Sequence, residues 1–510
     1  MALDQQRNWT IAMAENFEKV MSISNKENSK SPSNNVSQVT DKPGSPIVEW
    51  KNDPIHLPDE IIAGIISYIN PRHDRATLVS CCLLSWQWYQ AAVPLLYDHV
   101  SLHGQDFEPF VRAICPSINL HVRPSPLASL VHVLDMSNLV HQGSRSTTAR
   151  ILGRVKTSLR TFVAPQASFH ISCLPALSKC KHLQVLDLSL VSECPPLADL
   201  FRTVSHLPVL EDFRLPRSAG FGRHDFNLSS IAWPPRLQSL QLSGGIDSHF
   251  LEGVVGLPAT ITALSIVHCP HARTATILKF LRNAVQPLPK LRTITLANLP
   301  RLHEGSLDSI LGILPQIETL SVSIDYISAD LFDFRLYVYH EKSAEAWPIA
   351  PHLADDDIDD DAFPSGITSA TRTTPQLSSQ VDRAGKPLPQ HAALQTLILT
   401  NSGNPGASDR LTPVDIMLAM DEGCFPDLAT VHVANSLNWQ SGVEENTPLA
   451  REVASLDEAL RSSVGLSERT NGNEDGESAG WISQREEAVD GDKPSTRKGA
   501  RKAGVFFFHG

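Results

Sequence analysis

The sequence predicts a mixed α+β chain in which a small three-helix unit precedes an α/β solenoid of strand-plus-helix repeats. Three observations support this: a leucine-rich hexapeptide recurs at a regular interval, an isoleucine-rich helix stands ahead of the repeats, and polar stretches separate these parts. The chain has 510 residues, of which 42% are hydrophobic, enough to bury a sizeable core. We therefore expect a folded body flanked by polar segments.

The repeated hexapeptide has the form L-x-x-L-x-L. Its clearest copies are LQVLDL, LQSLQL, ITALSI, LRTITL, IETLSV and LQTLIL, which begin at Leu183, Leu237, Ile261, Leu291, Ile317 and Leu394. With weaker copies included, starts at positions 131, 159, 183, 210, 237, 261, 291 and 317 lie 24 to 30 residues apart. That interval is typical of one leucine-rich repeat, a strand followed by a helix. An ordinary α/β sheet is the alternative, and the regular spacing favours the solenoid.

Changes in composition give the predicted domain boundaries. Residues 21–46 are rich in Ser, Asn, Lys and Pro, and we predict a disordered arm over 1–46, a helical unit over 47–102 and the repeats over 103–440. An acidic stretch interrupts the repeats, and we predict a disordered insertion over about 343–390. Residues 441–510 are again polar and charged, which predicts a disordered tail.

The charge and the cysteines exclude several classes of protein. The formal net charge of −12 argues against binding nucleic acid through the overall field of the protein. No run of about 18 apolar residues is present to cross a membrane. The eight cysteines form no C-x-x-C pair, which predicts reduced, buried thiols rather than a zinc site. We expect a soluble protein of the cytoplasm and/or nucleus, with no cofactor.

Catalytic and metal-binding patterns are weak. The string GESAG around Ser478 has the G-x-S-x-G form of an esterase nucleophile, but it lies in a polar stretch without the required strand and helix, and His509 is nearly terminal. The aspartates of ADDDIDDD lack the alternating spacing and glycine of a calcium loop. No P-loop, G-x-G-x-x-G or H-E-x-x-H motif occurs. We therefore predict no catalytic residue and no metal ligand.

The N-terminal unit begins with LPDEIIAGIISYI, from Leu57 to Ile69. Pro58 suits the first position of a helix, acidic residues complement its positive end, and Ile61 and Ile65 lie one turn apart. Two further helices are predicted, over about residues 74–84 and from about residue 86 to the region of Pro94. A unit of this size buries little surface alone, so it is expected to pack against something else.

One set of residues in this unit carries a family resemblance. The set comprises Leu57-Pro58-x-Glu60-Ile61, Ile65, Tyr68-Ile69, Leu78, Val79, Cys82, Leu83, Ser85, Trp88 and Val93-Pro94-Leu95-Leu96-Tyr97. It resembles the F-box, in the style of fungal F-box proteins, over about residues 55–102. Trp86 is a departure, because similar sequences commonly place a basic residue after the serine matched to Ser85. Together with the repeats, the chain is similar to an F-box/leucine-rich-repeat protein.

The resemblance implies a non-catalytic subunit of an SCF-type cullin-RING ubiquitin ligase. In that family the F-box binds the Skp adaptor and, through it, cullin, while the repeats bind a protein substrate. The adaptor-binding residues carried over are Leu57, Pro58, Ile61, Ile62, Ile65, Leu78, Leu83 and Trp88. The first five are expected at or beneath the adaptor surface, whereas Leu78, Leu83 and Trp88 are expected to hold the three helices together.

The positions between the leucines are the candidates for substrate binding, because they line the strand face of a solenoid. At the fifth hexapeptide position they are Asp187, Arg214, Gln241, Ser265, Thr295 and Ser321. This strip has no basic cluster, which argues against dedicated recognition of phosphorylated segments. The main alternative function is a repeat scaffold outside any ligase, whose N-terminal helices only cap the solenoid. A hydrolase using Ser478 is disfavoured.

Overall fold

The computed structural model describes residues 57–71, 73–116, 125–140, 143–219, 231–254, 256–332, 392–402, 411–439, 447–469 and 503–508. The predicted arm (1–46), the predicted insertion (about 343–390), Ser478 and His509 all lie outside these residues. The chain divides into two compact units after Pro58. Only Leu57 and Pro58 of the first unit are described, so the architecture below is that of the second unit, from Asp59 onward.

Three helices open this unit: α2 (Asp59–Ser67), α3 (Arg75–Leu84) and α4 (Trp86–Asp98). Helix α2 begins one residue later than predicted, so Pro58 precedes the helix instead of occupying its first turn. Helix α4 continues past Pro94, although the proline lacks the N–H that would bond to the preceding turn. Ser85 caps α4, because its hydroxyl accepts a hydrogen bond from the backbone N–H of Trp88 at 3.3 Å.

Within the described residues a sheet of twelve parallel strands follows, and the strands lie in the same order as in the sequence. They are β1 (His99–Ser101), β2 (Val133–Asp135), β3 (Thr161–Val163), β4 (Val185–Asp187), β5 (Asp212–Arg214), β6 (Ser239–Leu242), β7 (Ala263–Val267), β8 (Thr293–Ala297), β9 (Thr319–Ser323), β10 (Thr396–Thr400), β11 (Thr430–Ala434) and β12 (Gly504–Phe508). All of the predicted hexapeptides form strands in this sheet. The order makes each strand pair only with its neighbours in the sequence, and the sheet stays open.

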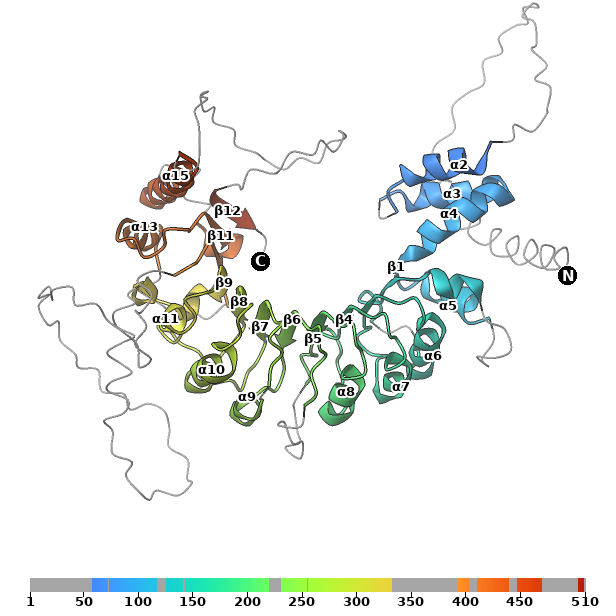
Figure 1. Ribbon diagram of the computed structural model, residues 1–510, viewed down its shortest axis with the longest axis horizontal. Coiled ribbons are helices and arrows are strands. Elements are labelled where there is room, and N and C mark those ends of the chain that lie inside the picture. The colour runs from blue at the N-terminus through green and yellow to red at the C-terminus, as the bar shows by residue number, and fades with distance from the viewer. Residues whose placement is uncertain are drawn as a thin grey trace, which may run out of the picture. The chain divides into compact units, whose positions relative to one another are not determined.

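Helices connect successive strands and lie on the outer side of the curved sheet (Figure 1). The α-helices are α5 (Phe107–Ile114), α6 (Arg145–Val155), α7 (Leu174–Leu177), α8 (Leu197–Val204), α9 (Ser248–Gly253), α10 (Thr274–Phe280), α11 (Ile310–Ile313) and α13 (Pro413–Asp421). A π-helical turn, η4 (Leu281–Val285), extends α10. Short 3-10 turns are η1 (Pro126–Leu130), η2 (Ile171–Cys173), η5 (Ile324–Tyr326), η6 (Ala329–Phe332) and η7 (Asn435–Leu437).

The core is a layer between the sheet and these helices. Strand pairing places the fourth hexapeptide position of each repeat next to its counterparts, in one row across the sheet. The row consists of Val100, Leu134, Phe162, Leu186, Phe213, Leu240, Leu264, Ile294, Leu320, Leu397 and Val431, each at most 1% exposed. Burying one such side chain contributes about 1.5–3 kcal/mol, so this continuous row holds the repeats together.

Strand β1 lies inside the predicted helical unit, which is a correction to the boundary at residue 102. Helix α4 ends at Asp98, β1 begins at His99, and β1 pairs with β2. The ring nitrogen Nδ1 of His132, just before β2, lies 2.7 Å from Oδ1 of Asp98. Helix α4 also packs against η1. The helices and the first repeat are therefore joined without a linker.

The predicted disordered tail is wrong at two places. Within residues 441–510 the structure contains the helix α15 (Pro448–Arg469) and the strand β12. Val453, Leu456 and Leu460 recur at helical spacing in α15 and are buried, and α15 packs against α13 and β12. The polar composition of the whole tail concealed this apolar stripe, which covers the end of the core.

Candidate functional site: an exposed apolar face on the N-terminal helices

Helix α2 has apolar side chains on two neighbouring faces, about 100° apart around the helix axis. Ile62 and Ile66, one turn apart, are 1% exposed, so they form the face that packs into the unit. Ile61, Ile65 and Tyr68 follow the same spacing on the other face and are 52%, 42% and 91% exposed. Single exposed apolar residues are normal, but three in helical register form a stripe that nothing in the described residues covers.

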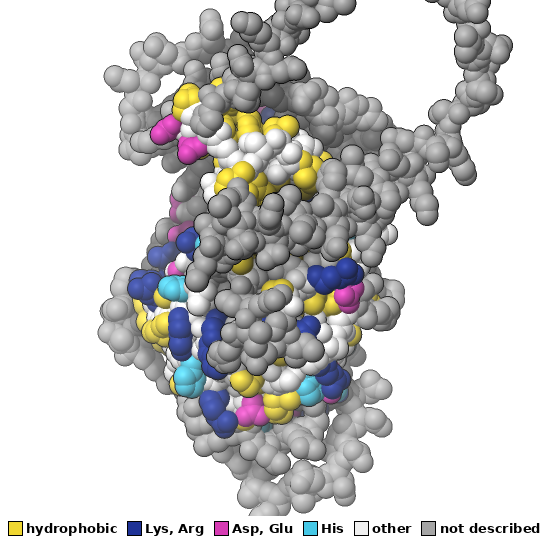
Figure 2. All heavy atoms as spheres, turned by 90° about the vertical axis from the view of Figure 1, so that its right-hand side faces the viewer, with side chains coloured by type: hydrophobic (Ala, Val, Ile, Leu, Met, Phe, Trp, Pro, Cys, Tyr) yellow, Lys and Arg dark blue, Asp and Glu magenta, His cyan; other side chains and the backbone are white. Residues whose placement is uncertain are grey.

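The junction of α3 and α4 adds further exposed apolar side chains. Val79 and Leu83 lie one turn apart on α3, Leu84 ends that helix, and Trp86 begins α4; all four are exposed. We call this set and the α2 stripe the apolar face: Ile61, Ile65, Tyr68, Val79, Leu83, Leu84 and Trp86. Figure 2 shows hydrophobic side chains gathered over these helices, at the top of that view.

Two contacts fix the relation between the stripe and the junction. The side-chain amide of Gln87, in the first turn of α4, donates a hydrogen bond to Oδ1 of Asp59, the first residue of α2, at 2.5 Å. The start of α2 and the α3–α4 junction therefore lie at the same end of the unit. Trp86 stacks on Tyr89, with ring centroids 5.3 Å apart and planes 15° apart. Its indole is thus held in place although about half of it is exposed.

The eight predicted adaptor-binding residues differ in their exposure. Ile61 and Ile65 lie on the apolar face, while Ile62 and Leu78 belong to the interior. Leu83, which was expected to hold the helices together, is 47% exposed and lies on the apolar face. The remaining three differ in exposure, with Leu57 and Trp88 half-buried and Pro58 exposed.

Four members of the apolar face were not among the predicted site residues: Tyr68, Val79, Leu84 and Trp86. The spacing of Ile61, Ile65 and Tyr68 carried a signal for the first of them. No sequence signal distinguished Val79 from Leu78, because consecutive helical residues face different sides and either one could be the buried one. The packing of α3 against α4 decides that Leu78 is buried and Val79 is exposed.

The chemistry of this region favours binding over catalysis. Burial, and secondarily the neighbouring Cys81, raises the pKa of the Cys82 thiol to about 11, so the thiol stays protonated at neutral pH. Burial also raises the pKa values of Cys173, Cys180, Cys194 and Cys269 on the repeats. Within the described residues no group of His, Cys, Asp and Glu has the arrangement of a metal site.

The six predicted substrate-binding residues form one row on the inner side of the sheet. Strand pairing aligns Asp187 with Arg214, Arg214 with Gln241, and so on through Ser265 and Thr295 to Ser321. The structure therefore brings together residues that are up to 134 positions apart in the sequence, from 187 to 321. Ser321 is 8% exposed, so it contributes less surface than the other five.

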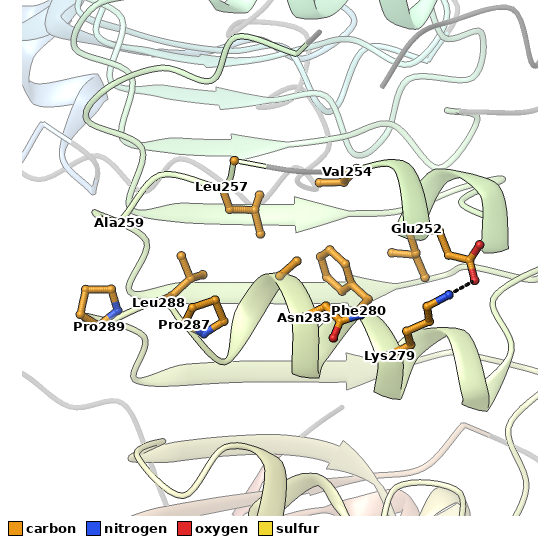
Figure 3. Close-up of a pocket in the computed structure, with 13 residues that line it drawn as sticks. Glu252, Val254, Leu257, Ala259, Lys279, Phe280, Asn283, Pro287, Leu288 and Pro289 are labelled. Carbon is orange, nitrogen blue, oxygen red and sulfur yellow. Dashed lines mark hydrogen bonds and ion pairs between the residues drawn. The ribbon is translucent and has the colours of Figure 1, made fainter. Parts of the chain in front are cut away.

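A cavity of about 500 Å³ lies elsewhere, on the outer side between α9 and α10 (Figure 3). Its walls are mainly apolar, with Leu257, Phe280 and Leu288 among them, and an ion pair of 3.0 Å joins Lys279 to Glu252 at its edge. No Ser, Cys or His lines this cavity, so it carries no nucleophile and base of the kind a hydrolase needs.

Comparison with known proteins identifies the helical unit. Residues 55–103 match the F-box-like family, and α2 to α4 lie within that range. The chain is 27% identical to the F-box protein YDR306C of Saccharomyces cerevisiae over 383 residues, which cover 74% of this chain and 67% of that protein. It is 28% identical to the protein pof5 of Schizosaccharomyces pombe over 246 residues, which cover 48% of this chain and 66% of that protein.

Residues 55–103 therefore form an F-box-like domain, and the chain is homologous to fungal F-box proteins. The similarity spans about two thirds of each relative. In the described residues, no helix combines the length and hydropathy that crossing a bilayer requires.

Proposed function

We propose that this protein is a substrate-recognition subunit of an SCF-type cullin-RING ubiquitin ligase. The apolar face of the F-box-like domain binds the Skp adaptor and, through it, cullin, while the inner side of the sheet binds a protein substrate. The observation that carries the proposal is the exposed stripe of Ile61, Ile65 and Tyr68 on a domain that matches the F-box-like family. An exposed contiguous apolar patch is the usual mark of a protein-binding surface.

The adaptor interface rests on hydrophobic contacts. Trp86 occupies the position where similar sequences have a basic residue, and it is about half exposed beside Tyr89. A large aromatic side chain held by stacking loses little conformational freedom on binding, so it substitutes apolar contact area for a polar contact. Full burial of an exposed side chain contributes about 1.5–3 kcal/mol, so covering the remaining 52% of Ile61 contributes about half of that.

We further propose that the sheet and its outer helices are a leucine-rich-repeat solenoid. The repeated hexapeptides coincide with the strands, the strands follow one another in sequence order, and the buried positions form one row. Such an array presents a long inner surface with no catalytic group of its own. The protein would therefore act by proximity, because holding a substrate lysine near a ubiquitin-charged enzyme raises the effective concentration of the reacting groups.

The cytoplasm and nucleus are the compartments that fit this role. All eight cysteines are free thiols, and five are buried, which is the pattern of a protein kept in a reducing environment. The thiols indicate only a reducing compartment, whereas the proposed ligase partners indicate the cytoplasm and nucleus in particular.

Co-purification with the Skp adaptor tests the proposal. Ile61→Asp with Ile65→Asp places two carboxylates on the apolar face, where they would be buried without partners in the complex. We expect adaptor binding to weaken at least tenfold, as measured by calorimetry on the purified chain. Ala63→Asp with Ser67→Asp is the matched control, because both are exposed residues of the same helix outside the stripe and receive the same two charges. If the wild-type chain purifies without the adaptor, the proposal is refuted.

A second function, a scaffold outside any ligase, is favoured by one observation. Helix α4 runs directly into β1 and packs on η1, so the helices also cover the first end of the sheet. Deleting residues 47–102 cannot separate the two functions, because the deletion also removes β1. The two aspartate substitutions can separate the functions. If the helices only cap the sheet, no partner contacts Ile61 and Ile65, and the substituted chain should keep all of its binding partners.

A further inference from the structure

Among the described strand residues, the positions that face the inner side of the sheet carry all of their charge at one end. Alternate residues of each strand face this side, because side chains of a strand point to opposite faces. On β1 to β5 these positions include Asp135, Asp187, Asp212 and Arg214. From β6 to β12 the corresponding positions hold no Asp, Glu, Lys or Arg; they are Ser239, Gln241, Ala263, Ser265, Val267, Thr293, Thr295, Ala297, Thr319, Ser321, Ser323, Thr396, Ile398, Thr400, Thr430, His432, Ala434, Gly504, Phe506 and Phe508.

The charged end has an excess of carboxylates. Arg214 is shared by two of them, with Nη1 3.2 Å from Oδ2 of Asp187 and Nη2 3.1 Å from Oδ2 of Asp212. Asp135 has no ion pair within the described residues, and its Oδ1 accepts a hydrogen bond from the backbone N–H of Ser137 at 2.9 Å. Three carboxylates against one guanidinium leave a formal excess of two negative charges. This end therefore attracts a cation.

The middle of the row is small and polar. From β6 to β9 the inner positions are mostly Ser and Thr, with Gln241 as the largest. Ser321 and Ser323 on β9 are buried, but the part-exposed hydroxyl side chains of β6 to β8 leave room for another backbone to approach and offer it hydrogen bonds. Nothing in this stretch demands a charged or bulky side chain from the bound partner.

The far end of the row is apolar and aromatic. Strand pairing aligns Ile398 with His432 and His432 with Phe506. The rings of His432 and Phe506 stack with centroids 5.2 Å apart and planes 26° apart. Burial lowers the pKa of His432, so its ring is neutral at pH 7 and adds to an uncharged floor. The bulky residues at this end suit an aliphatic or aromatic side chain.

We propose that the inner side of the sheet binds an extended, unphosphorylated protein segment with Lys or Arg at one end and aliphatic or aromatic residues at the other. The basic end lies over β2 to β5, near Asp135 and Asp187, and the apolar end lies over β10 to β12. Eight strand spacings separate β4 from β12, about 38 Å, which about 12 extended residues span. That this segment belongs to a ubiquitination substrate rests on the proposed function; the binding preference does not.

The competing preference is for acidic or phosphorylated segments. Lys156, Lys179 and Lys181 lie at the ends of the outer helices, near the starts of the strands, and a segment bound along that rim would need negative charge. That site lies off the inner row, so substitutions in the row distinguish the two preferences.

Selection from a display library of random 12-residue peptides tests the inference, with the full chain in complex with the Skp adaptor, or alone if no complex forms. We expect the bound peptides to be enriched in Lys or Arg toward one end and in Leu, Ile or Phe toward the other. Asp135→Asn with Asp187→Asn should reduce the basic enrichment at least tenfold and leave the apolar enrichment. Asp199→Asn, on the outer helix α8, is the matched control and should change neither.

A second pair of variants tests the apolar end. Ile398→Thr with His432→Thr places residues that favour strands at both positions and should remove the apolar enrichment alone. Enrichment in Asp or Glu, absence of any enrichment, or an unchanged selection in both pairs of variants would overturn the inference. Adaptor binding should be normal in all of these variants, so failure of the inner-face preference is distinguishable from failure of the proposed ligase role.

Discussion

The substitution Leu456→Ala tests whether the C-terminal helix is part of the folded body. Leu456 is fully buried on α15, between Val453 and Leu460, and α15 packs against α13 and β12. The change removes the equivalent of about three methyl or methylene groups, worth about 2.4 kcal/mol in transfer from water, and leaves a cavity. Leucine-to-alanine changes at such sites cost about 2–5 kcal/mol, and we expect the same here.

The loss should be local, because each repeat contacts only its neighbours. Hydrogen exchange followed by mass spectrometry should show faster exchange in α15 and β12, with β5 to β8 unchanged. Ser455→Ala is the control, since Ser455 is exposed on the same helix and the change should have little effect. If Leu456→Ala leaves the exchange of residues 448–460 unchanged, the packing of this helix onto the sheet is wrong and the sequence-based prediction of a disordered tail is restored.

Three further changes probe other parts of the structure. Tyr326→Phe removes the hydroxyl that accepts the buried N–H of Leu299 at 2.7 Å, and should lower the free energy of unfolding by about 1–3 kcal/mol in a denaturant titration. Gly244→Ala should lower the thermal midpoint, because φ is +95° and the new Cβ would lie 2.5 Å from a backbone oxygen, whereas Gly64→Ala, with open space in α2, should raise it. Burial lowers the pKa of His432, so as the pH falls the unfolded chain binds a proton at this residue before the folded chain does. The free energy of unfolding should therefore decline below about pH 6.5. His432→Gln should make that decline shallower, as measured by denaturant titrations at pH 7 and pH 6.

Strands β2 to β11 were predictable from the sequence, because the spacing of the hexapeptides and their side-chain alternation are both local. Leu186 and Leu240 occupy the same place in hexapeptides, and the structure puts both in one buried row. Strand β1 was not readable, because His99–Ser101 has only three residues and lacks the hexapeptide. Strand β12 was missed for a different reason. It begins at Gly504, 70 residues after its partner β11 ends at Ala434, and no local pattern signals that pairing.

The apolar face was predictable in kind but not in membership. The isoleucines of α2 indicated a helix with two apolar sides, and the family resemblance indicated that one of them meets another protein. Which residues are exposed depends on α4, which packs against both α2 and α3. Leu83 could not be assigned from the sequence, because a leucine in an apolar helix is usually interior, yet here it is 47% exposed.

The junction between α4 and β1 gives the proposed mechanism a physical basis. A flexible linker between an adaptor-binding domain and a substrate-binding domain would spread the substrate lysine over a large volume and dilute it. Here the chain passes from Asp98 to His99 without a linker, and the contact of Asp98 with His132 ties the end of the helix to the start of β2. A partner held on the inner side of the sheet is thus positioned relative to the apolar face, and the gain in effective concentration depends on that fixed geometry.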